Sequence, residues 1–580
     1  MKLYKICNKI SLLLHVLASA AGYFVMEAIC RHSFIEAWNY MTQRPLVFAY
    51  NAAFIFTSSL IVYLFHRRVF WRILVTLFWL ILAIINGVLL LNRVTPFTGP
   101  DLHLITDAMK IANKYLPVAG VVAVCILFGI LVILLLILLI KGPKYQKKIK
   151  YRYNIPLILL AVALFAGSTQ LALEKRVLSN YFGNIAFAYE DYGYPYCLGV
   201  TIFNTGISCP RDYSEEEIER IEKTEDNLPA TNEKNQPNIL FLQLESFFDP
   251  TLVNYLKISE DPIPTFRKLM KEYSSGYYKV PAVGAGTANT EFEFLTGDTM
   301  AFLPAGSIPY QQYITKNTPS MASYLKSLGY ETYAMHPYYA SGWNRDKIYP
   351  LLGFDSFYSS TDFYGSTYER GYIDDSSCVD KIIETYEKKD AGTPAFIFNV
   401  TMQNHSPYTD GYQNLQGNVT VDGTVSAQLS EYLTLVKLSD TALEKLIDYF
   451  ETQDEPTVIV FFGDHQPTDA VVEPIWNLEG KSSSDLTEEE NQLRYKVPYV
   501  IWANYDIDEA VNQESSANYL GAQMMEAAGI PLSDYQNYLL EQKKEMPLIS
   551  TQHTEAEGSD AWLNYQTLQY YLLFDWDGEK

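Results

Sequence analysis

Residues 456–467 read PTVIVFFGDHQP, and this stretch decides the fold class. Its first half is a run of β-branched and aromatic side chains, which is typical of a buried β-strand. The run stops at Gly463, and Asp464 and His465 follow at once. In an open α/β sheet, ligands bind outside the carboxyl ends of the strands, where a carboxylate and an imidazole are natural metal ligands. A turn whose Asp caps a helix, with the His merely exposed, is the alternative interpretation.

Further strand-like runs alternate with helical stretches in the second half of the chain. The predicted strands are residues 239–244, 331–335, 395–400, 457–462 and 497–502, and the predicted helices are 264–273, 319–328, 378–388, 427–451 and 516–528. This alternation predicts a mostly parallel sheet covered by helices. With about 340 residues, such a domain can bury a large core.

Reactive side chains follow four of these predicted strands. They are Glu245 and Ser246, then His336, then Asn404 and His405, and finally Asp464 and His465. Because the carboxyl ends of parallel strands share one edge of a sheet, we expect these residues to converge there.

A segment rich in small residues lies between the first two predicted strands. Residues 283–294 read VGAGTANTEFEF, and a helix is predicted to begin at Thr287 or just after. A hydroxyl at a helix N-terminus faces backbone N–H groups and the positive end of the dipole, which suits a phosphate. Alternatively Thr287 is simply an N-cap, with Asn289 and Thr290 as rivals for that position.

Glu245, Thr287, Asp464 and His465 together supply two carboxylates, a hydroxyl and an imidazole. This oxygen-rich set with one His suits Mn²⁺ or Mg²⁺, with Zn²⁺ as a further option. A metal bound to the Thr287 oxygen lowers its pKa and makes it a nucleophile.

Residues 341–346, SGWNRD, add a cation in a connection between a predicted strand and helix. Arg345 can grip a phosphate through two hydrogen bonds. Trp343 is either a wall of the same pocket or a partly buried surface residue.

Charge and hydropathy divide the chain into two parts. Residues 1–173 carry 17 Lys and Arg against 4 Asp and Glu, a net charge of +13, whereas the remainder carries 27 against 62, a net charge of −35. The first part contains apolar stretches close to the length of about 20 residues that a bilayer requires. They are residues 10–30, 46–65, 70–91, 117–140 and 155–173, and a cleaved signal peptide is the alternative for the first. The sequence therefore predicts five transmembrane spans.

The distribution of Lys and Arg predicts the orientation of these spans. Basic residues gather in the N-terminus and in the loops after the second and fourth spans. With five spans these segments share the cytoplasmic side, and everything after about residue 174 is extracytoplasmic. Cys197 and Cys209 lie in that outer part, and the sequence leaves open whether they form a disulfide.

Three segments follow from this organisation. We predict a transmembrane domain over residues 1–174, a linker with helical segments over 175–236, and an extracellular catalytic domain over 237–580. A charged helix with Ser214 as its N-cap is expected within the linker.

The motifs resemble those of the lipoteichoic acid synthase family, the membrane-anchored phosphoglycerol transferases of the alkaline phosphatase/sulfatase superfamily. The matching segments are LES at 244–246, GTANTEF at 286–292, WNRD at 343–346, NH at 404–405 and GDH at 463–465. The resemblance covers nearly the whole chain. It implies a five-helix transmembrane domain followed by an extracellular α/β sulfatase-like domain, with a mostly parallel sheet flanked by helices.

The resemblance also implies roles for single residues. Glu245, Thr287, Asp464 and His465 match the metal ligands, with Mn²⁺ as the expected ion, and Thr287 matches the nucleophile. The matching substrate-binding residues are Trp343, Arg345, His405 and His336. Residues 284–286, Gly-Ala-Gly, replace a more polar stretch usual in the family, which leaves the exact substrate open. The Cys/Ser-x-Pro-x-Arg motif of true sulfatases is not found.

The implied reaction moves glycerol phosphate from phosphatidylglycerol, through a threonine-linked intermediate, to a glycolipid anchor or a growing lipoteichoic-acid-type polymer. The expected partners are these lipids, the bilayer and the cell-wall synthesis machinery, with no nucleic acid, and the expected location is the cell membrane. A phosphoethanolamine transferase of the same superfamily is the alternative enzyme. A non-catalytic wall-binding or sensory protein is the alternative of another class, and a transporter is disfavoured because the spans hold few charges.

Overall fold

The computed structural model describes residues 11–91, 96–99, 101, 118–175, 177–178, 185–203, 209–210, 213–225, 236–304, 306–408, 415, 418–482, 485–551 and 554–576. The chain divides into two compact units, Met1–Thr205 and Gly206–Lys580. The three-part division at residues 174 and 236 stays a prediction.

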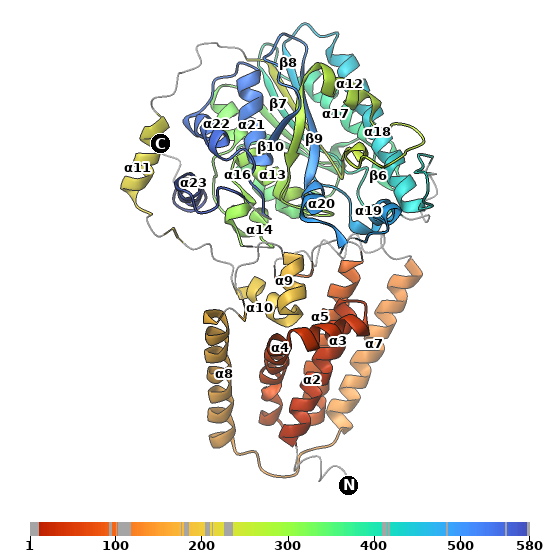
Figure 1. The fold of residues 1–580 in the computed structure, drawn as a ribbon, viewed down its shortest axis with the longest axis vertical. Coiled ribbons are helices and arrows are strands. Elements are labelled where there is room, and N and C mark those ends of the chain that lie inside the picture. Colours follow the sequence, from red (N-terminus) through yellow and green to blue (C-terminus); the bar gives the residue numbers. More distant parts are fainter. Residues whose placement is uncertain are drawn as a thin grey trace. The chain divides into compact units, whose positions relative to one another are not determined.

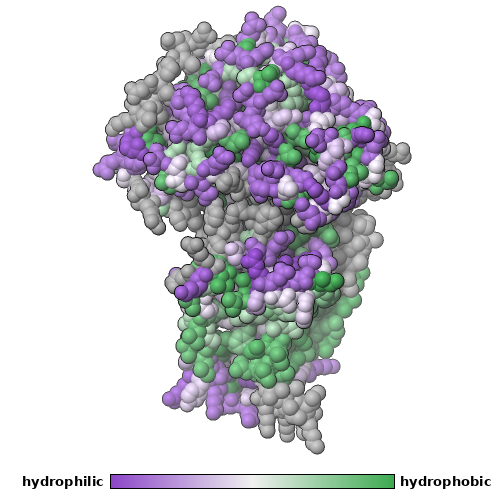
Figure 2. Space-filling view, in the orientation of Figure 1, coloured by the Kyte–Doolittle hydropathy of each residue, from purple (hydrophilic) through white to green (hydrophobic). Residues whose placement is uncertain are grey.

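The first unit is built from apolar helices (Figure 1). They are α2 (Ser11–Cys30), α4 (Pro45–Ser58) continued by the 3₁₀ turn η1 (Ser59–Leu64), α5 (Arg68–Leu90), α7 (Val118–Lys141) and α8 (Tyr151–Glu174). Four stretches are long and apolar enough to cross a membrane: Ser11–Cys30, Pro45–Leu64, Arg68–Leu90 and Tyr151–Leu173. In α7 the corresponding described stretch is Phe128–Lys141. Figure 2 shows the hydrophobic belt that these helices form.

Three shorter helices accompany the spans: α3 (Phe34–Gln43), α9 (Ile185–Tyr192) and α10 (Tyr194–Phe203). Side chains of the spans bind the start of α10, because Glu27 accepts from the Tyr194 N–H at 3.0 Å and Asn51 accepts from the Tyr196 N–H at 2.9 Å. Cys197 and Cys209 do not form a disulfide, because both are free cysteines in the structure.

The second unit is organised around an eight-stranded sheet of order β10-β2-β9-β8-β1-β7-β3-β4. The strands are β1 (Asn238–Leu244), β2 (Ser274–Lys279), β3 (Glu331–Met335), β4 (Ser356–Tyr358), β7 (Ala395–Val400), β8 (Thr457–Gly463), β9 (Lys496–Ala503) and β10 (Gln513–Ser516). The central strands β8, β1, β7 and β3 are parallel, whereas β9 runs antiparallel to both of its neighbours. The prediction of a mostly parallel sheet is confirmed.

Helices cover both faces of this sheet (Figure 1). One layer contains α12 (Pro264–Glu272), α17 (Asp375–Lys388) and α18 (Ala427–Phe450), and the other contains α13 (Thr287–Thr296), α16 (Arg345–Leu351) and α21 (Ala517–Ala527). The strands β1, β7 and β8 are buried along their whole length, as their largely apolar side chains predict. The charged helix expected after Ser214 is α11 (Glu215–Glu225), and the Ser214 hydroxyl accepts from the Glu217 N–H at 3.1 Å.

Candidate active site

The site begins where two neighbouring parallel strands end in register. Leu244 of β1 pairs with Gly463 of β8, so Glu245 and Asp464 leave the sheet side by side. Ser246 then turns the chain with a positive φ of 48°. The Ser246 N–H donates to Asp464 Oδ1 at 2.7 Å, which links the two strand ends directly.

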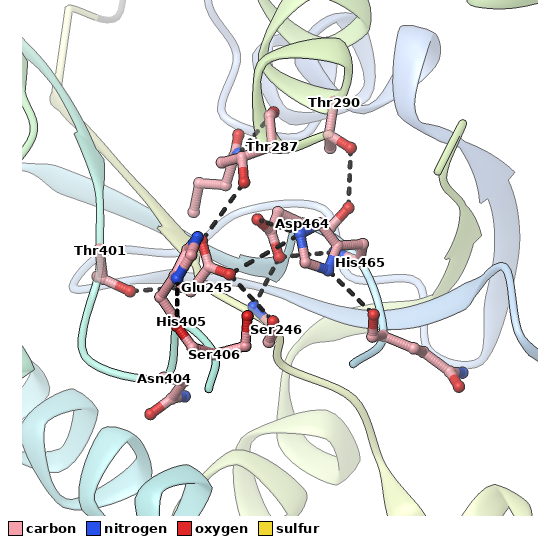
Figure 3. A network of polar contacts seen from close by, with 12 residues as sticks. Glu245, Ser246, Thr287, Thr290, Thr401, Asn404, His405, Ser406, Asp464 and His465 are labelled. Atoms are coloured by element: carbon pink, nitrogen blue, oxygen red, sulfur yellow. Dashed lines mark hydrogen bonds and ion pairs between the residues drawn. The ribbon is translucent and has the colours of Figure 1, made fainter. Parts of the chain in front are cut away.

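Three candidate metal ligands meet at this edge. Single ligand atoms of Glu245, Asp464 and His465 all lie within 4.8 Å of one another, and the three residues are buried. His465 Nε2 lies 3.4 Å from Asp464 Oδ2 and 3.8 Å from Glu245 Oε1. Figure 3 shows these side chains gathered with Thr287. The convergence expected from the strand ends is therefore present for this pair of strands.

Thr287 reaches the same cluster from the first position of α13. Its Oγ1 lies 3.4 Å from Glu245 Oε2 and the residue is buried. The N-cap of α13 is Gly286, not Thr287, Asn289 or Thr290, and its φ is +96°. A side chain at Gly286 would bring Cβ to 2.9 Å from the Cβ of Ala282, so glycine fits this turn. The Thr287 hydroxyl is thus not used as a helix cap.

The electrostatics of the cluster match a cation site. Burial raises the pKa of Asp464 to about 7. Burial, with the nearby Asp464 carboxylate, also raises the pKa of Glu245, and burial lowers the pKa of His465. Asp464 Oδ2 is buried and accepts no hydrogen bond from any residue that the structure describes. A buried carboxylate oxygen without a donor is costly, and a divalent cation supplies the missing positive charge.

Neighbouring polar groups fix the orientation of these ligands. Thr401 Oγ1 accepts from the Glu245 N–H at 3.0 Å, and the Thr290 hydroxyl donates to the Asp464 carbonyl at 2.8 Å. His465 Nδ1 lies 3.0 Å from the Gln466 carbonyl, which favours an Nδ1–H tautomer and leaves Nε2 for a metal. Sequence reasoning missed Thr401 and Thr290 in these roles, since a threonine that bonds to a neighbouring backbone carries no pattern of its own.

Two further predicted histidines follow β3 and β7. His405 is half-buried, and its Nδ1 lies 2.7 Å from the Ser406 carbonyl. His336 is buried, with Nδ1 3.0 Å from the Val400 carbonyl, and burial lowers its pKa well below the ordinary value. His336 is therefore neutral, and His405 is the more accessible of the two.

The segment with Trp343 and Arg345 adopts an unusual backbone. Trp343 and Asn344 have positive φ values of 56° and 60°, a costly conformation for side chains of this size. Arg345 follows at the start of α16 and is 1% exposed. Its guanidinium forms an ion pair with Glu291 of α13, although burial opposes the charge, and the pair holds the Arg345 pKa above its ordinary value.

Arg345 is thus already engaged by a carboxylate, and its role in binding phosphate stays a prediction. Arg345 Nε lies 3.2 Å from both oxygens of Glu291, and Nη2 also bonds to that carboxylate. Nη1 has only a long contact of 3.5 Å, to the Gly342 carbonyl. The partner Glu291 was not singled out in the sequence, because nothing in the letters relates two residues 54 positions apart.

Comparisons with known proteins identify the family to which this unit belongs. The sulfatase family model matches residues 237–530. A Rhizobium meliloti protein named for cyclic beta-1,2-glucan modification is 32% identical over 60% of this chain and 55% of its own length. The lipoteichoic acid synthase of Staphylococcus saprophyticus is 24% identical over 58% of this chain and 53% of its own length. The chain spans about half the length of these curated relatives.

A solved structure supports the fold. The phosphoglycerol transferase GacH of Streptococcus pyogenes, in complex with sn-glycerol-1-phosphate, superposes with a TM-score of 0.53 at 21% identity, covering 63% of this chain and 95% of that one. The apolar helices and these relatives together identify a multi-pass membrane protein. With a family match over half of its length, the chain belongs to the sulfatase family, as a lipoteichoic acid synthase-like membrane member of the alkaline phosphatase/sulfatase superfamily.

Proposed function

We propose that this protein is a metal-dependent phosphoglycerol transferase that takes glycerol phosphate from phosphatidylglycerol and passes it to an acceptor hydroxyl through Thr287. The observation that carries the proposal is the buried Thr287 hydroxyl, 3.4 Å from Glu245 in a cluster with Asp464 and His465. The names of a lipoteichoic acid synthase and of a phosphoglycerol transferase among the similar proteins support this choice of substrate.

Glu245, Asp464 and His465 are the residues that would hold the metal, together with the Thr287 oxygen. A divalent cation bound there, Mn²⁺ in this proposal, would supply positive charge that favours the alkoxide form of Thr287. The donor set is two carboxylates and one imidazole, and Asp464 Oδ2 is free to bind.

Thr287 performs the first transfer. Its oxygen forms a bond to the phosphorus of phosphatidylglycerol, the bond between phosphorus and the diacylglycerol oxygen breaks, and diacylglycerol leaves with a proton. His405, half-buried at the same edge, is the proposed source of that proton. Positive charge from Arg345 Nη1, the guanidinium nitrogen not bonded to Glu291, stabilises the transferring group.

An acceptor hydroxyl completes the cycle. Its oxygen bonds to the phosphorus, its proton passes to His405, and the Thr287 oxygen is released. The acceptor we propose is a glycolipid anchor or a growing polyglycerolphosphate chain, with this unit on the extracellular side of the membrane. Trp343 and His336 are proposed to shape the pocket for the glycerol.

A saccharide hydroxyl is the second candidate acceptor. The relative named for cyclic beta-1,2-glucan modification is more similar to this chain, at 32% identity, than the lipoteichoic acid synthase at 24%. Incubating the purified protein with labelled phosphatidylglycerol and either a glycolipid or an oligoglucan separates the two acceptors by the product that becomes labelled. Labelled phosphatidylethanolamine in place of phosphatidylglycerol tests the phosphoethanolamine alternative.

The nucleophile is tested with Thr287→Ala in the full-length protein in detergent. Release of diacylglycerol is expected to fall about a thousandfold or more, as when other enzymes lose a nucleophile. The matched control is Thr441→Ala, which makes the same change on the exposed surface of α18 and should leave the rate unchanged. Equal rates for the two variants would refute the role of Thr287.

A further inference from the structure

A second charged cluster lies at one end of the helix bundle in the first unit. The loop between η1 and α5 carries Arg67, and Arg68 and Arg72 follow on α5. Arg67 has acceptors in the protein, because it donates to the Ile140 and Gly142 carbonyls at the end of α7. Arg67 therefore stabilises the negative end of that helix dipole.

Arg68 is buried without such an acceptor. It is 9% exposed, and its Nε has no hydrogen-bond partner within the described part of the chain. Its guanidinium lies 3.7 Å above the ring of Tyr145 and 5.1 Å from that of Tyr63, and these aromatic contacts are its only charge-related interactions among the described residues. A buried cation without an anion or hydrogen-bond acceptor is unstable.

Arg72, one turn further along α5, faces the same Tyr63. It donates to the Ser11 hydroxyl at 2.6 Å and to the Tyr63 hydroxyl at 3.3 Å, and its Nε is also buried without a partner. The two guanidinium groups thus share one aromatic wall. A further positive contribution comes from the start of α5, whose first turn has no side-chain cap and no acidic residue.

The sequence of this unit supplies no carboxylate for these arginines. Residues 1–26, 37–100 and 108–173 contain no Asp or Glu, so the helices and loops that form this end of the bundle are free of acidic side chains. The loop positions are nevertheless well fixed, because the Tyr145 N–H donates to the His66 carbonyl at 2.7 Å. The site is cationic, and the described residues around it supply no anion.

We infer that Arg68 and Arg72 form a binding site for a phosphate group, carried by an anionic lipid at the basic end of the membrane-spanning helices. Two guanidinium groups and neighbouring hydroxyls match the several acceptor oxygens of a phosphate. Arg68 is the first residue of an apolar stretch long enough to cross a membrane, and further basic residues lie in the segment 141–152, which favours a lipid headgroup over free phosphate. This inference is independent of the proposed transferase activity.

The test uses full-length protein in phosphatidylcholine nanodiscs, with and without phosphatidic acid. Phosphatidic acid is chosen because it carries the phosphate but is not the proposed donor. Native mass spectrometry should show wild-type protein retaining phosphatidic acid, and both Arg68→Gln and Arg72→Gln should weaken that binding about tenfold. The matched control is Lys147→Gln, which removes one positive charge from an exposed residue at the same end and should bind like wild type.

Four results would overturn the inference. Binding by Arg68→Gln as tight as by wild type, or an equal loss in Lys147→Gln, would replace a defined site with diffuse attraction. Equal thermal stabilisation of the wild-type protein by phosphatidic acid and by phosphatidylcholine would show that the protein does not prefer the anionic lipid. This comparison needs no variant, so it holds even if Arg68→Gln fails to fold. Stabilisation by inorganic phosphate alone, in detergent, would assign the site to the free ion and not to lipid.

Discussion

Replacing Glu291 with Gln is expected to destabilise the second unit by about 3–5 kcal/mol, the usual cost of removing one partner of a buried ion pair. Glu291 is fully buried and Arg345 is 1% exposed, so water cannot replace the lost carboxylate. The carboxylate accepts from Arg345 Nε at 3.2 Å and from the Tyr349 hydroxyl at 2.8 Å. A glutamine keeps one acceptor but leaves the guanidinium charge without a counter-ion.

The assay is urea unfolding of the full-length protein in detergent, followed by tryptophan fluorescence. The matched control is Arg220→Gln, which breaks an ion pair with Glu217 whose side chains are 55% and 27% exposed. That exposed pair is expected to contribute at most about 1 kcal/mol. The double variant Glu291→Gln/Arg345→Met should recover much of the loss, with a coupling energy of at least about 2 kcal/mol.

A loss below about 1 kcal/mol in Glu291→Gln would refute the reasoning, since it falls within the range of exposed pairs. Arg345 would then not depend on Glu291, and all of its nitrogens would be open to a phosphate. Additive effects in the double variant would lead to the same conclusion.

Three further predictions concern the metal, a buried acid and a turn. EDTA is expected to abolish transfer and Mn²⁺ to restore it, and Asp464→Asn should weaken Mn²⁺ binding in calorimetry by at least about tenfold; unchanged affinity would exclude Asp464 as a ligand. Burial raises the pKa of Glu293 from 4.5 to about 8, so the folded state keeps a proton that the unfolded state releases, and stability should fall as pH rises from 4.5 to 8. Glu293→Gln should flatten that slope of urea midpoint against pH, and a slope equal to wild type would contradict the assignment. Gly286→Ala should cost about 1–2 kcal/mol for its positive φ and more for the 2.9 Å contact with Ala282, and should slow diacylglycerol release. The control is Gly371→Ala, where φ is also positive but no atom lies within 4 Å; equal effects of the two variants would show that the contact is unimportant.

Several strands of the central sheet could be predicted because they are short runs rich in apolar, β-branched and aromatic side chains. Predicted residues 331–335 and 395–400 are β3 and β7, and residues 457–462 lie within β8. By contrast, β2 (Ser274–Lys279) and β10 (Gln513–Ser516) were not predicted, since SSGYYK and QESS show neither an apolar run nor a clear alternation. The pairing of β2 with β10 on one side and with β9 on the other arises only in the assembled sheet.

The candidate site likewise contains some residues whose positions could be predicted from the sequence and others whose positions could not. Asp464 and Glu245 could be predicted because each follows a strand, and parallel topology brings such residues together. The burial of Arg345 against Glu291 could not, because it depends on how α13 and α16 pack over the sheet. Nor does the sequence show that Gly286 is the N-cap of α13. Because Gly286 takes that position, the Thr287 hydroxyl lies next to Glu245.

The in-register pairing of Leu244 with Gly463 has a consequence for the order of folding. β1 lies between β7 and β8, and both partners come later in the chain. During synthesis, β1 therefore presents two unpaired edges until residues 395–400 and then 457–463 have left the ribosome, and such edges favour aggregation. Ser246 and Asp464 are 218 positions apart, so their contact closes a long loop. The candidate metal ligands Glu245, Asp464 and His465 are consequently assembled late, and a nascent chain that ends before β8 lacks two of the three.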